Sequence, residues 1–404
     1  GLVLNYKTGL GALELSEFRK PKYEIYTSGL YLCALKMFQK VFEKLGLEER
    51  SRQLSEKIER VESSLEKLLW NGEKESYAFS MNTNGELFPY LTPWPCFPIS
   101  LGIMDESRAK KTVSKLLDSS VMTRWGARSI EVCEHYDPIN YNLGSVWYFI
   151  NGFVSKAFYR TDFEAQGFQI IKAAVKAFHE ESTTHLSELF SGDIFAPVTT
   201  AVPHQLFSVG PIVWAITSGL LGLSFDAFEN VLHFKPKLPV QWNRLIVDGL
   251  KVGKALLRIE FTRKGKQHVW SFKNLSSNPV KVFFEPKRPI LGEIEGNGTF
   301  EFTLEGEHSV GYTLRGADFS FEYPNLSFGS SDDRILTYSE TRREDGLELR
   351  FSNAHDARIY LLCTDDILVD AESHLSVSKV DEFLFVIETK SSKEVRLDLR
   401  RLKR

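Results

Sequence analysis

Two acidic residues stand in loop-like stretches where proton transfer could take place. Glu188 lies in HLSELFSGD, beside leucine and phenylalanine, and Glu14 follows a glycine-rich turn in GLGALELSEF. Two carboxyl groups facing one another across a pocket are the minimum equipment for hydrolysing a glycosidic bond, because one protonates the leaving oxygen while the other activates water or attacks. Each acid has a simpler interpretation as an exposed glutamate near a helix end, and the spacing alone leaves both open.

The stretch WGARSIEVCEHYDPINYNLGSVW, from Trp125 to Trp147, concentrates aromatic and polar side chains. Aromatic rings offer flat faces for the apolar side of a sugar ring, while Arg, Asn, Gln and His donate to or accept from its hydroxyls. The stretch therefore indicates a sugar-binding loop that enters a helix at Gly144, and a hydrogen-bonded structural plug is the alternative. The candidate substrate-binding residues are Trp94, Trp125, Arg128, Tyr141, Asn142, Trp147, His204 and Gln205.

Other chemistries have weaker support in the sequence. The histidines form no HExxH or HxH pattern, so no metal site is predicted. Ser145 stands in NLGSVW and not in the GxSxG of a nucleophile elbow. The glycines of GLGALE do not form a nucleotide-binding GxGxxG motif, and no cofactor is predicted. The four cysteines lie far apart without a CxxC pair, which favours reduced thiols.

Composition and charge fit a soluble globular protein. The chain has 404 residues, enough for roughly two domains, and 43% of them are hydrophobic. Its 50 basic and 53 acidic residues are interspersed and give a net charge of −3, so a nucleic-acid partner is not expected. No apolar run of about 18 residues predicts a membrane span. The compartment stays open, with the cytoplasm slightly favoured.

The hydrophobic periodicity changes along the chain. Residues 1–227 are expected to form a helical domain, with apolar residues at three-to-four spacing. Residues 228–404 contain short runs of period two separated by turn residues, which predict an antiparallel β-sandwich domain. The expected helices span about 22–45, 48–70, 107–117, 144–159, 161–179 and 210–221.

Helical hairpins with decorated loops gathered at one end are typical of an α/α toroid. A closed (α/α)6 barrel needs twelve helices, and the periodicity indicates only about six. The chain is therefore expected to hold about the second half of such a barrel. Half a toroid would expose a wide apolar surface, so an upstream segment or a companion subunit should complete it.

Five motifs in register carry a resemblance to a known family. WGARS, YDPINYNLGSVW, HLSELFSGD, AVPHQLFS and GLLGL, in this order, resemble the amylo-α-1,6-glucosidase (glycogen-debranching-enzyme-like) family of six-hairpin glycosidases. The resemblance covers roughly residues 1–260. It implies an inverting glycoside hydrolase with an (α/α)6 catalytic barrel that acts on α-glucosidic bonds.

The resemblance also implies roles for individual residues. Glu188 occupies the position of the family's general base, and Glu14, with Glu17 behind it, occupies that of the general acid. The WGxR and YNxGSVW segments would line the sugar subsite. The sequence departs from the family at Leu143, where a small polar residue is usual, and at Tyr148, where a proline is usual.

Two hypotheses follow. The first is an inverting glycoside hydrolase acting on α-linked gluco-oligosaccharides, in which the two carboxyl groups lie about 6.5–9.5 Å apart. The second is a carbohydrate-binding or scaffold protein that kept the fold and lost the chemistry, as the substitutions at Leu143 and Tyr148 would allow. The first requires the candidate residues to converge at one end of the helices.

Overall fold

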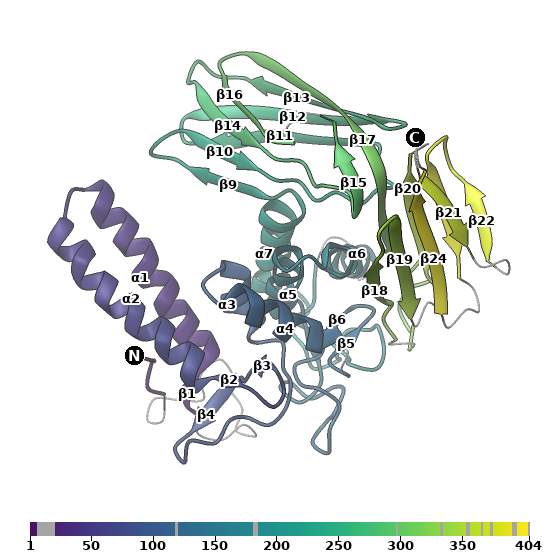
Figure 1. Cartoon of the computed structure of the whole chain (residues 1–404). Helices are drawn as coiled ribbons and strands as arrows, with labels where there is room; N and C mark the ends of the chain where they lie inside the picture. Colours follow the sequence, from purple (N-terminus) through teal and green to yellow (C-terminus); the bar gives the residue numbers. More distant parts are fainter. Residues whose placement is uncertain are drawn as a thin grey trace. The chain divides into compact units, whose positions relative to one another are not determined.

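The computed structural model of this chain (Figure 1) describes residues 1–5, 21–117, 120–180, 185–295, 298–331, 334–352, 356–364, 367–371, 375–389 and 394–402. These residues form two compact units. The helical unit comprises Gly1–Ala215 and Leu326–Arg334, and the strand-rich unit comprises Ile216–Asn325 and Ile335–Arg404. The expected succession of a helical and a sheet-rich part is therefore confirmed. The boundary expected after residue 227 lies between the first two strands of the second unit.

An antiparallel helical hairpin opens the helical unit (Figure 1), with α1 (Ile25–Lys44) joined to α2 (Glu48–Leu68) through Gly46. Gly46 has a φ of 70°, which a residue with a side chain adopts only at a cost. On α2 the buried apolar residues Ile58, Val61 and Leu65 recur at three-to-four spacing, so one face of the helix turns inward. The amphipathic pattern of this hairpin was therefore sufficient to predict it.

The other helices surround α5, which contacts α3, α6 and α7. The helix expected from Gly144 begins only at Tyr148, because Val146 and Trp147 form a short strand. The helix expected over 210–221 begins at Leu206 and continues after Trp214 as a π-helix. The helices are α3 (Cys96–Leu101), α4 (Glu106–Leu117), α5 (Tyr148–Arg160), α6 (Glu164–Glu180), α7 (Leu206–Trp214) and the π-helix η2 (Ala215–Leu220).

Short antiparallel strand pairs hold the connections of the helical unit. Each pair joins segments on the sides of a loop or, in two cases, segments distant in sequence. The pairs are β1 (Pro21–Glu24) with β4 (Ser80–Asn82), β2 (Trp70–Asn71) with β3 (Ser76–Tyr77), β5 (Met122–Thr123) with β6 (Gly126–Ala127), and β7 (Val146–Trp147) with β8 (Leu189–Phe190).

Three sheets make up the described part of the strand-rich unit. The first has the order β16 (Phe300–Leu304), β14 (Val280–Phe284), β10 (Val231–Phe234), β9 (Leu223–Asp226). The second has the order β11 (Arg244–Val252), β12 (Ala255–Lys264), β13 (Gln267–Asn274), β17 (Glu307–Glu322), β20 (Arg358–Cys363), β23 (Leu384–Glu388), β22 (Ser376–Lys379), with β15 (Leu291–Ile294) beside β17. The third has the order β18 (Thr337–Arg342), β19 (Gly346–Ser352), β24 (Glu394–Arg401), β21 (Ile367–Ala371).

An aromatic cluster forms part of the core of this unit. Phe234, Trp270, Phe272 and Phe284 are fully buried, with Phe234 and Trp270 edge to face at 5.1 Å. Apolar and polar residues alternate along β12 and β13, as expected for strands with one buried face. The sequence predicted antiparallel pairing, but β10 and β14 run parallel to each other.

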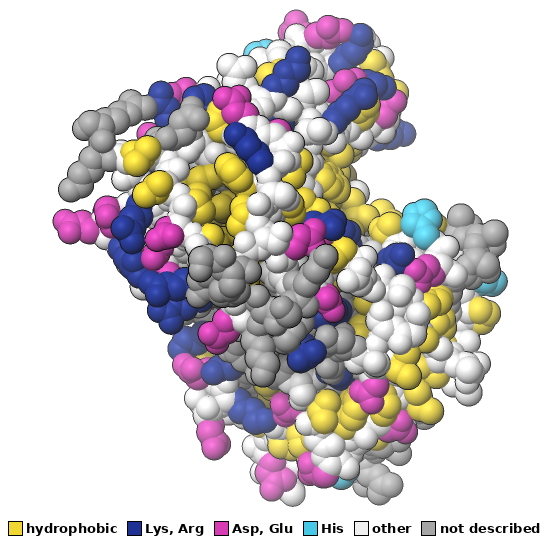
Figure 2. Space-filling model, turned by 90° about the vertical axis from the view of Figure 1, so that its right-hand side faces the viewer, with side chains coloured by type: hydrophobic (Ala, Val, Ile, Leu, Met, Phe, Trp, Pro, Cys, Tyr) yellow, Lys and Arg dark blue, Asp and Glu magenta, His cyan; other side chains and the backbone are white. Residues whose placement is uncertain are grey.

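The surface carries both charge signs among apolar side chains, as the face drawn in Figure 2 shows. No helix in the described part of the chain is both long and apolar enough to cross a membrane.

Candidate active site

A short strand pair brings the two decorated loops of the helical unit together. Trp147 on β7 pairs with Leu189 on β8, the residue that follows Glu188. On its other side the Glu188 segment meets the chain near Val202, whose carbonyl accepts a 2.9 Å hydrogen bond from the Glu188 amide. Glu188 thus sits in a ribbon between two segments and is only 7% exposed.

Tyr141 holds the Glu188 carboxylate from the opposite loop. Its hydroxyl donates a 2.7 Å hydrogen bond to Glu188 Oε1. The Tyr141 ring packs edge to face against Trp147, with the ring centroids 4.4 Å apart. The Trp147 indole N–H donates to the Tyr141 carbonyl at 2.7 Å and to Ser145 Oγ at 3.0 Å. Tyr141 is therefore fixed at both its backbone and its ring while it contacts the acid.

Trp94 extends this aromatic group toward α1. Its ring lies 6.4 Å from that of Trp147 and 5.4 Å from that of Tyr26, both in edge-to-face orientation. Its buried indole N–H finds no hydrogen-bond acceptor in the described residues. A buried donor without a partner is costly, which makes this N–H available for a ligand hydroxyl.

Asn142 is a second residue whose buried polar side-chain atoms have no hydrogen-bond partner in the described residues. Its side chain is completely buried, and neither its amide nitrogen nor its amide oxygen has a hydrogen-bond partner in the part of the chain described. Its backbone is well fixed, because the amide donates to Asn140 Oδ1 at 2.9 Å and the carbonyl accepts from Ser129 Oγ at 2.8 Å. The side chain thus keeps a donor and an acceptor unused beside Tyr141.

Trp125 and Arg128 lie beneath this group. Trp125 has no exposed surface, and its indole N–H donates to the Ser191 carbonyl at 2.8 Å. Arg128 is also buried, and its guanidinium donates to the carbonyls of Gly192 and Ser120 at 3.0 and 2.5 Å. Neither offers a face to a sugar in this structure, since the β8 turn covers them. Through these hydrogen bonds they stabilise the loop that carries Glu188, and the stacking and binding roles expected from sequence stay predictions.

His204 and Gln205 reach the site through backbone pairing. The Gln205 amide donates to the Leu186 carbonyl at 3.1 Å, which places Gln205 beside the segment that precedes Glu188. His204 is exposed, and its ring lies against His185 with centroids 3.7 Å apart. The two histidines thus stand on adjoining segments of the ribbon that carries Glu188.

Two glycines allow the loops to approach so closely. A Cβ atom at Gly144 would stand 2.5 Å from the Asp137 carbonyl oxygen, and one at Gly192 would stand 2.3 Å from the Gly144 carbonyl oxygen. Both distances are below any normal contact with fixed backbone atoms. Glycine at these positions is therefore required by packing.

Sequence reasoning missed Asn151 and Tyr136. Asn151 on α5 accepts from the Ala127 amide at 2.6 Å and donates to the carbonyls of Ala127 and Trp147, so it ties β6 to β7. Tyr136 accepts from Arg128 Nε and donates to Asp193 at 2.5 Å, and burial raises its pKa. The only signal for Asn151 was an amide in an otherwise apolar helical stretch.

Glu24 is a further buried acid that sequence reasoning missed. It is the N-cap residue of α1, where its carboxylate accepts from the amides of Tyr26 and Thr27 at 2.9 and 2.7 Å. Burial raises its pKa, while the hydrogen bonds from Thr27 and Tyr26 oppose that shift. Because its oxygens are occupied at the helix terminus, its role is capping.

Glu14 and Glu17 lie outside the described residues, so the separation of Glu188 from the expected general acid stays a prediction. Within the described ranges, no three His, Cys, Asp or Glu side chains form a group that could hold a metal ion.

Part of the helical unit is similar to a known family of glycoside hydrolases. Residues 21–193, less than half of the chain, match the model of the mannosylglycerate hydrolase MGH1-like glycoside hydrolase domain. The matched range includes Trp94, Tyr141, Asn142, Trp147 and Glu188. The class implied by the sequence resemblance is thereby supported, although this model is not that of the glycogen-debranching family. No curated protein matches the chain.

The solved structures that match this chain are longer than it. A sialidase matches with a TM-score of 0.55 and 13% identity, over 60% of this chain and 24% of the sialidase. An α-L-rhamnosidase from Aspergillus terreus matches with a TM-score of 0.48 and 12% identity, over 72% and 30% of the two chains. A GH63 mannosylglycerate hydrolase from Thermus thermophilus, in complex with glucose, matches with a TM-score of 0.40 and 20% identity, over 48% and 45%. This chain therefore spans less than half the length of each.

Proposed function

We propose that this chain carries the general base of an inverting glycoside hydrolase that cleaves α-glucosidic bonds in oligosaccharides or polysaccharides. The observation that supports it most is the buried Glu188 carboxylate, held by the Tyr141 hydroxyl at 2.7 Å inside a glycoside hydrolase domain. A carboxylate fixed in this way beside aromatic rings fits the activation of a water molecule next to a sugar.

The two oxygens of Glu188 would have different roles. Tyr141 engages Oε1, and no described residue is hydrogen-bonded to Oε2. Oε2 would therefore accept the proton of the attacking water, while Tyr141 keeps the carboxylate plane fixed. The general acid would be Glu14, with Glu17 as its alternative, placed about 6.5–9.5 Å from Glu188 to leave room for the water.

The substrate would meet the aromatic group around Trp147. Tyr141, which is partly exposed, would pack against the apolar face of a glucose ring, with the buried Trp94 and Trp147 supporting it from behind. The unused amide of Asn142 would bind a sugar hydroxyl. His204 and Gln205 would bind a second sugar at the ribbon edge. Because the matching model is mannosylglycerate hydrolase-like, mannosylglycerate is the appropriate competing substrate to test.

The test is hydrolysis of α-linked gluco-oligosaccharides and of mannosylglycerate by the complete protein, with proton NMR of the fresh product. We expect a product of inverted anomeric configuration, and Glu188→Gln should lower kcat by at least about a hundredfold while keeping the fold and substrate binding. Glu134→Gln is the matched control, because Glu134 is exposed and also accepts from a tyrosine, Tyr90. Near-normal turnover by Glu188→Gln would place the base elsewhere. Oligosaccharide binding without turnover by the wild-type protein would favour a binding-only protein.

Further helices, from an upstream segment or a companion subunit, would complete an (α/α)6 toroid. On α1, Met37 and Phe38 are 64 and 58% exposed, the C-cap residue Leu45 is 65% exposed, and on α7 Leu206 is 84% exposed. Apolar side chains exposed in this number on the helices of one unit mark a surface that packs against another element. Phe38→Glu should therefore reduce association of the helical unit with those helices in sedimentation experiments. Unchanged sedimentation would argue against this surface.

A further inference from the structure

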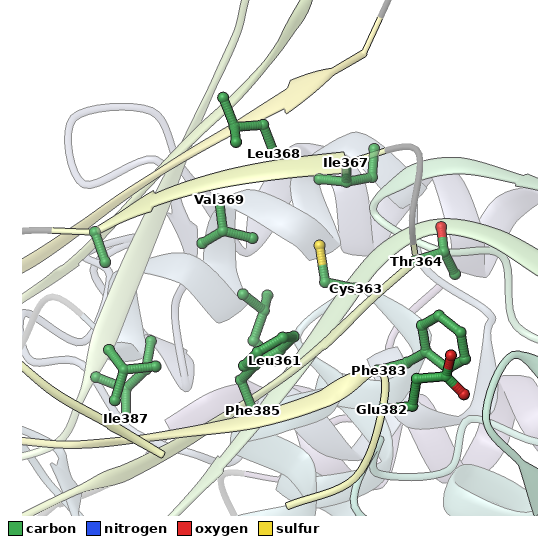
Figure 3. Close-up of a pocket in the computed structure, with 12 residues that line it drawn as sticks. Leu361, Cys363, Thr364, Ile367, Leu368, Val369, Glu382, Phe383, Phe385 and Ile387 are labelled. Carbon is green, nitrogen blue, oxygen red and sulfur yellow. The ribbon is translucent and has the colours of Figure 1, made fainter. Parts of the chain in front are cut away.

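A cavity lies in the strand-rich unit, away from every residue of the candidate active site in the sequence. Its volume is about 450 Å³. Strand β21 lines one side, and β20, β22 and β23 line the other, so the cavity separates an edge of the third sheet from an edge of the second (Figure 3). Pockets of this volume, lined mainly by apolar side chains, are typical of small-molecule sites.

Alternating residues of these strands point into the cavity. On β21, residues Ile367, Val369 and Ala371 line it, and the exposed Leu368 also contributes to its lining (Figure 3). On the facing strands, Leu361 and Cys363 come from β20, and Phe385 and Ile387 from β23. The inward side chains of β21 are small toward its end, so the two layers do not fill the space between them as they would in a complete core.

The interior of the cavity is apolar. Leu361 and Ile387 are almost completely buried, and Thr364 uses its hydroxyl with the backbone of Gly316, from which it accepts at 2.7 Å and to which it donates at 3.1 Å. Among the described lining side chains, every buried polar atom has a hydrogen-bond partner, so none of them needs a bound water. The cavity is open to solvent at Leu368 and Val377, which are 51 and 48% exposed. Its volume of about 450 Å³ lies in the range of small-molecule sites.

A single charged group marks one end. Glu382 lines the cavity at the end where Thr364 and Phe383 also lie, with Ile387 at the other end (Figure 3). The Glu382 carboxylate forms no ion pair with any residue in the described ranges, whereas its neighbour Asp381 is paired with Arg263. The Lys266 ammonium, which does not line the cavity, lies 5.6 Å from the centroid of the Phe383 ring at the same end. The exposed Glu382 carboxylate, as the charged group of the described lining, favours a ligand that donates a hydrogen bond to it.

We propose that this cavity is a binding site for a small apolar, aromatic or alicyclic molecule that carries an amino or hydroxyl group at one end. The apolar body fills the space between β21 and the facing strands, and the polar end donates to Glu382. The site is independent of the glycosidase proposal, since it shares no residue with the candidate active site.

The test uses the neutral fluorophore N-phenyl-1-naphthylamine and the full chain. Its fluorescence should rise saturably on binding, and Ala371→Phe, which places a phenyl ring into the cavity, should weaken binding at least about tenfold. Leu256→Phe is the matched control, because it adds the same ring at an exposed position on β12. Circular dichroism checks the fold. If Ala371→Phe does not fold, Val377→Phe replaces it, since Val377 lines the cavity yet is 48% exposed.

Binding to the exposed helix faces of the other unit is distinguished by these variants. Saturable binding that both cavity variants leave unchanged would overturn the proposal, as would the absence of saturable binding. The chemical class is tested by competition between 1-naphthylmethylamine and 1-naphthylacetate, which have the same ring and opposite charge. We expect the amine to displace the fluorophore at an at least fivefold lower concentration, and Glu382→Gln to abolish most of this difference. Equal competition by the two in the wild-type protein would refute the role of Glu382.

Discussion

Removal of the Tyr141 hydroxyl tests the arrangement around Glu188 most directly. Tyr141→Phe keeps the ring that packs against Trp147 and removes only the donor to Glu188 Oε1. A hydrogen bond to a charged group contributes about 1.5–3 kcal/mol, and each 1.4 kcal/mol corresponds to a tenfold change. If this bond is fully effective in the transition state, kcat should fall by about tenfold to a hundredfold, with a smaller change in KM.

The same substitution should also lower stability. Glu188 would keep one buried oxygen without its donor, so the free energy of unfolding should fall by about 1–3 kcal/mol in urea titrations. This measurement does not depend on activity. It therefore separates a positioning role, which changes kcat beyond the effect on folding, from a role in folding alone.

Tyr90→Phe provides the matched control. Tyr90 also donates from its hydroxyl to a glutamate, Glu134, but that pair is at the surface. Its loss should change the unfolding free energy by less than about 1 kcal/mol and leave kcat unchanged. Wild-type kcat and stability in Tyr141→Phe would refute the reasoning, because the hydrogen bond would then have no effect on either the acid or the fold.

Three further predictions concern buried polar groups. Asn142→Leu should raise the unfolding free energy by about 1 kcal/mol, because it removes two unpaired polar atoms, and should lower kcat/KM when assayed on oligosaccharides. Trp147→Phe removes two hydrogen bonds and part of the aromatic contact, so urea unfolding should show a loss of about 2–4 kcal/mol. Burial lowers the pKa of His268 to about 4, so only the unfolded chain binds its proton between about pH 6.5 and 4. As the pH is lowered through this range, the free energy of unfolding should therefore decrease by up to about 3 kcal/mol. His268→Leu should reduce that pH dependence.

Helices and strands that a local pattern of apolar residues specifies could be predicted from the sequence. Helix α2 has one apolar face, and Gly46 marks the turn between α1 and α2. The alternation in β12 and β13 likewise identified strands with one buried face. By contrast, the parallel pairing of β10 with β14 depends on which distant segments meet, and no local pattern specifies that. The same reason explains why the start of α5 was placed too early, since β7 forms only through its pairing with β8.

The candidate site shows the same limit at the level of side chains. Residue type and spacing selected Trp94, Trp125, Tyr141 and Trp147 alike, because an aromatic residue in a loop looks the same whether its ring faces a ligand or the core. The pairing of β7 with β8 determines which way the side chains of Trp125 and Tyr141 face. It places the Ser191 carbonyl over the indole N–H of Trp125, while Tyr141 is turned toward Glu188.

The hydrogen-bond partners of these side chains distinguish residues that stabilise the loops from residues that would bind substrate. The indole N–H of Trp125 and the guanidinium of Arg128 donate to backbone carbonyls, so they stabilise the loop whether or not a substrate is bound. Trp94 and Asn142 are also buried, yet their polar side-chain atoms have no partner in the described residues. An unpaired buried polar group costs about 1–3 kcal/mol, and a ligand hydroxyl that satisfies it recovers that cost on binding. We therefore expect substrate selection to depend more on Trp94 and Asn142 than on Trp125 and Arg128.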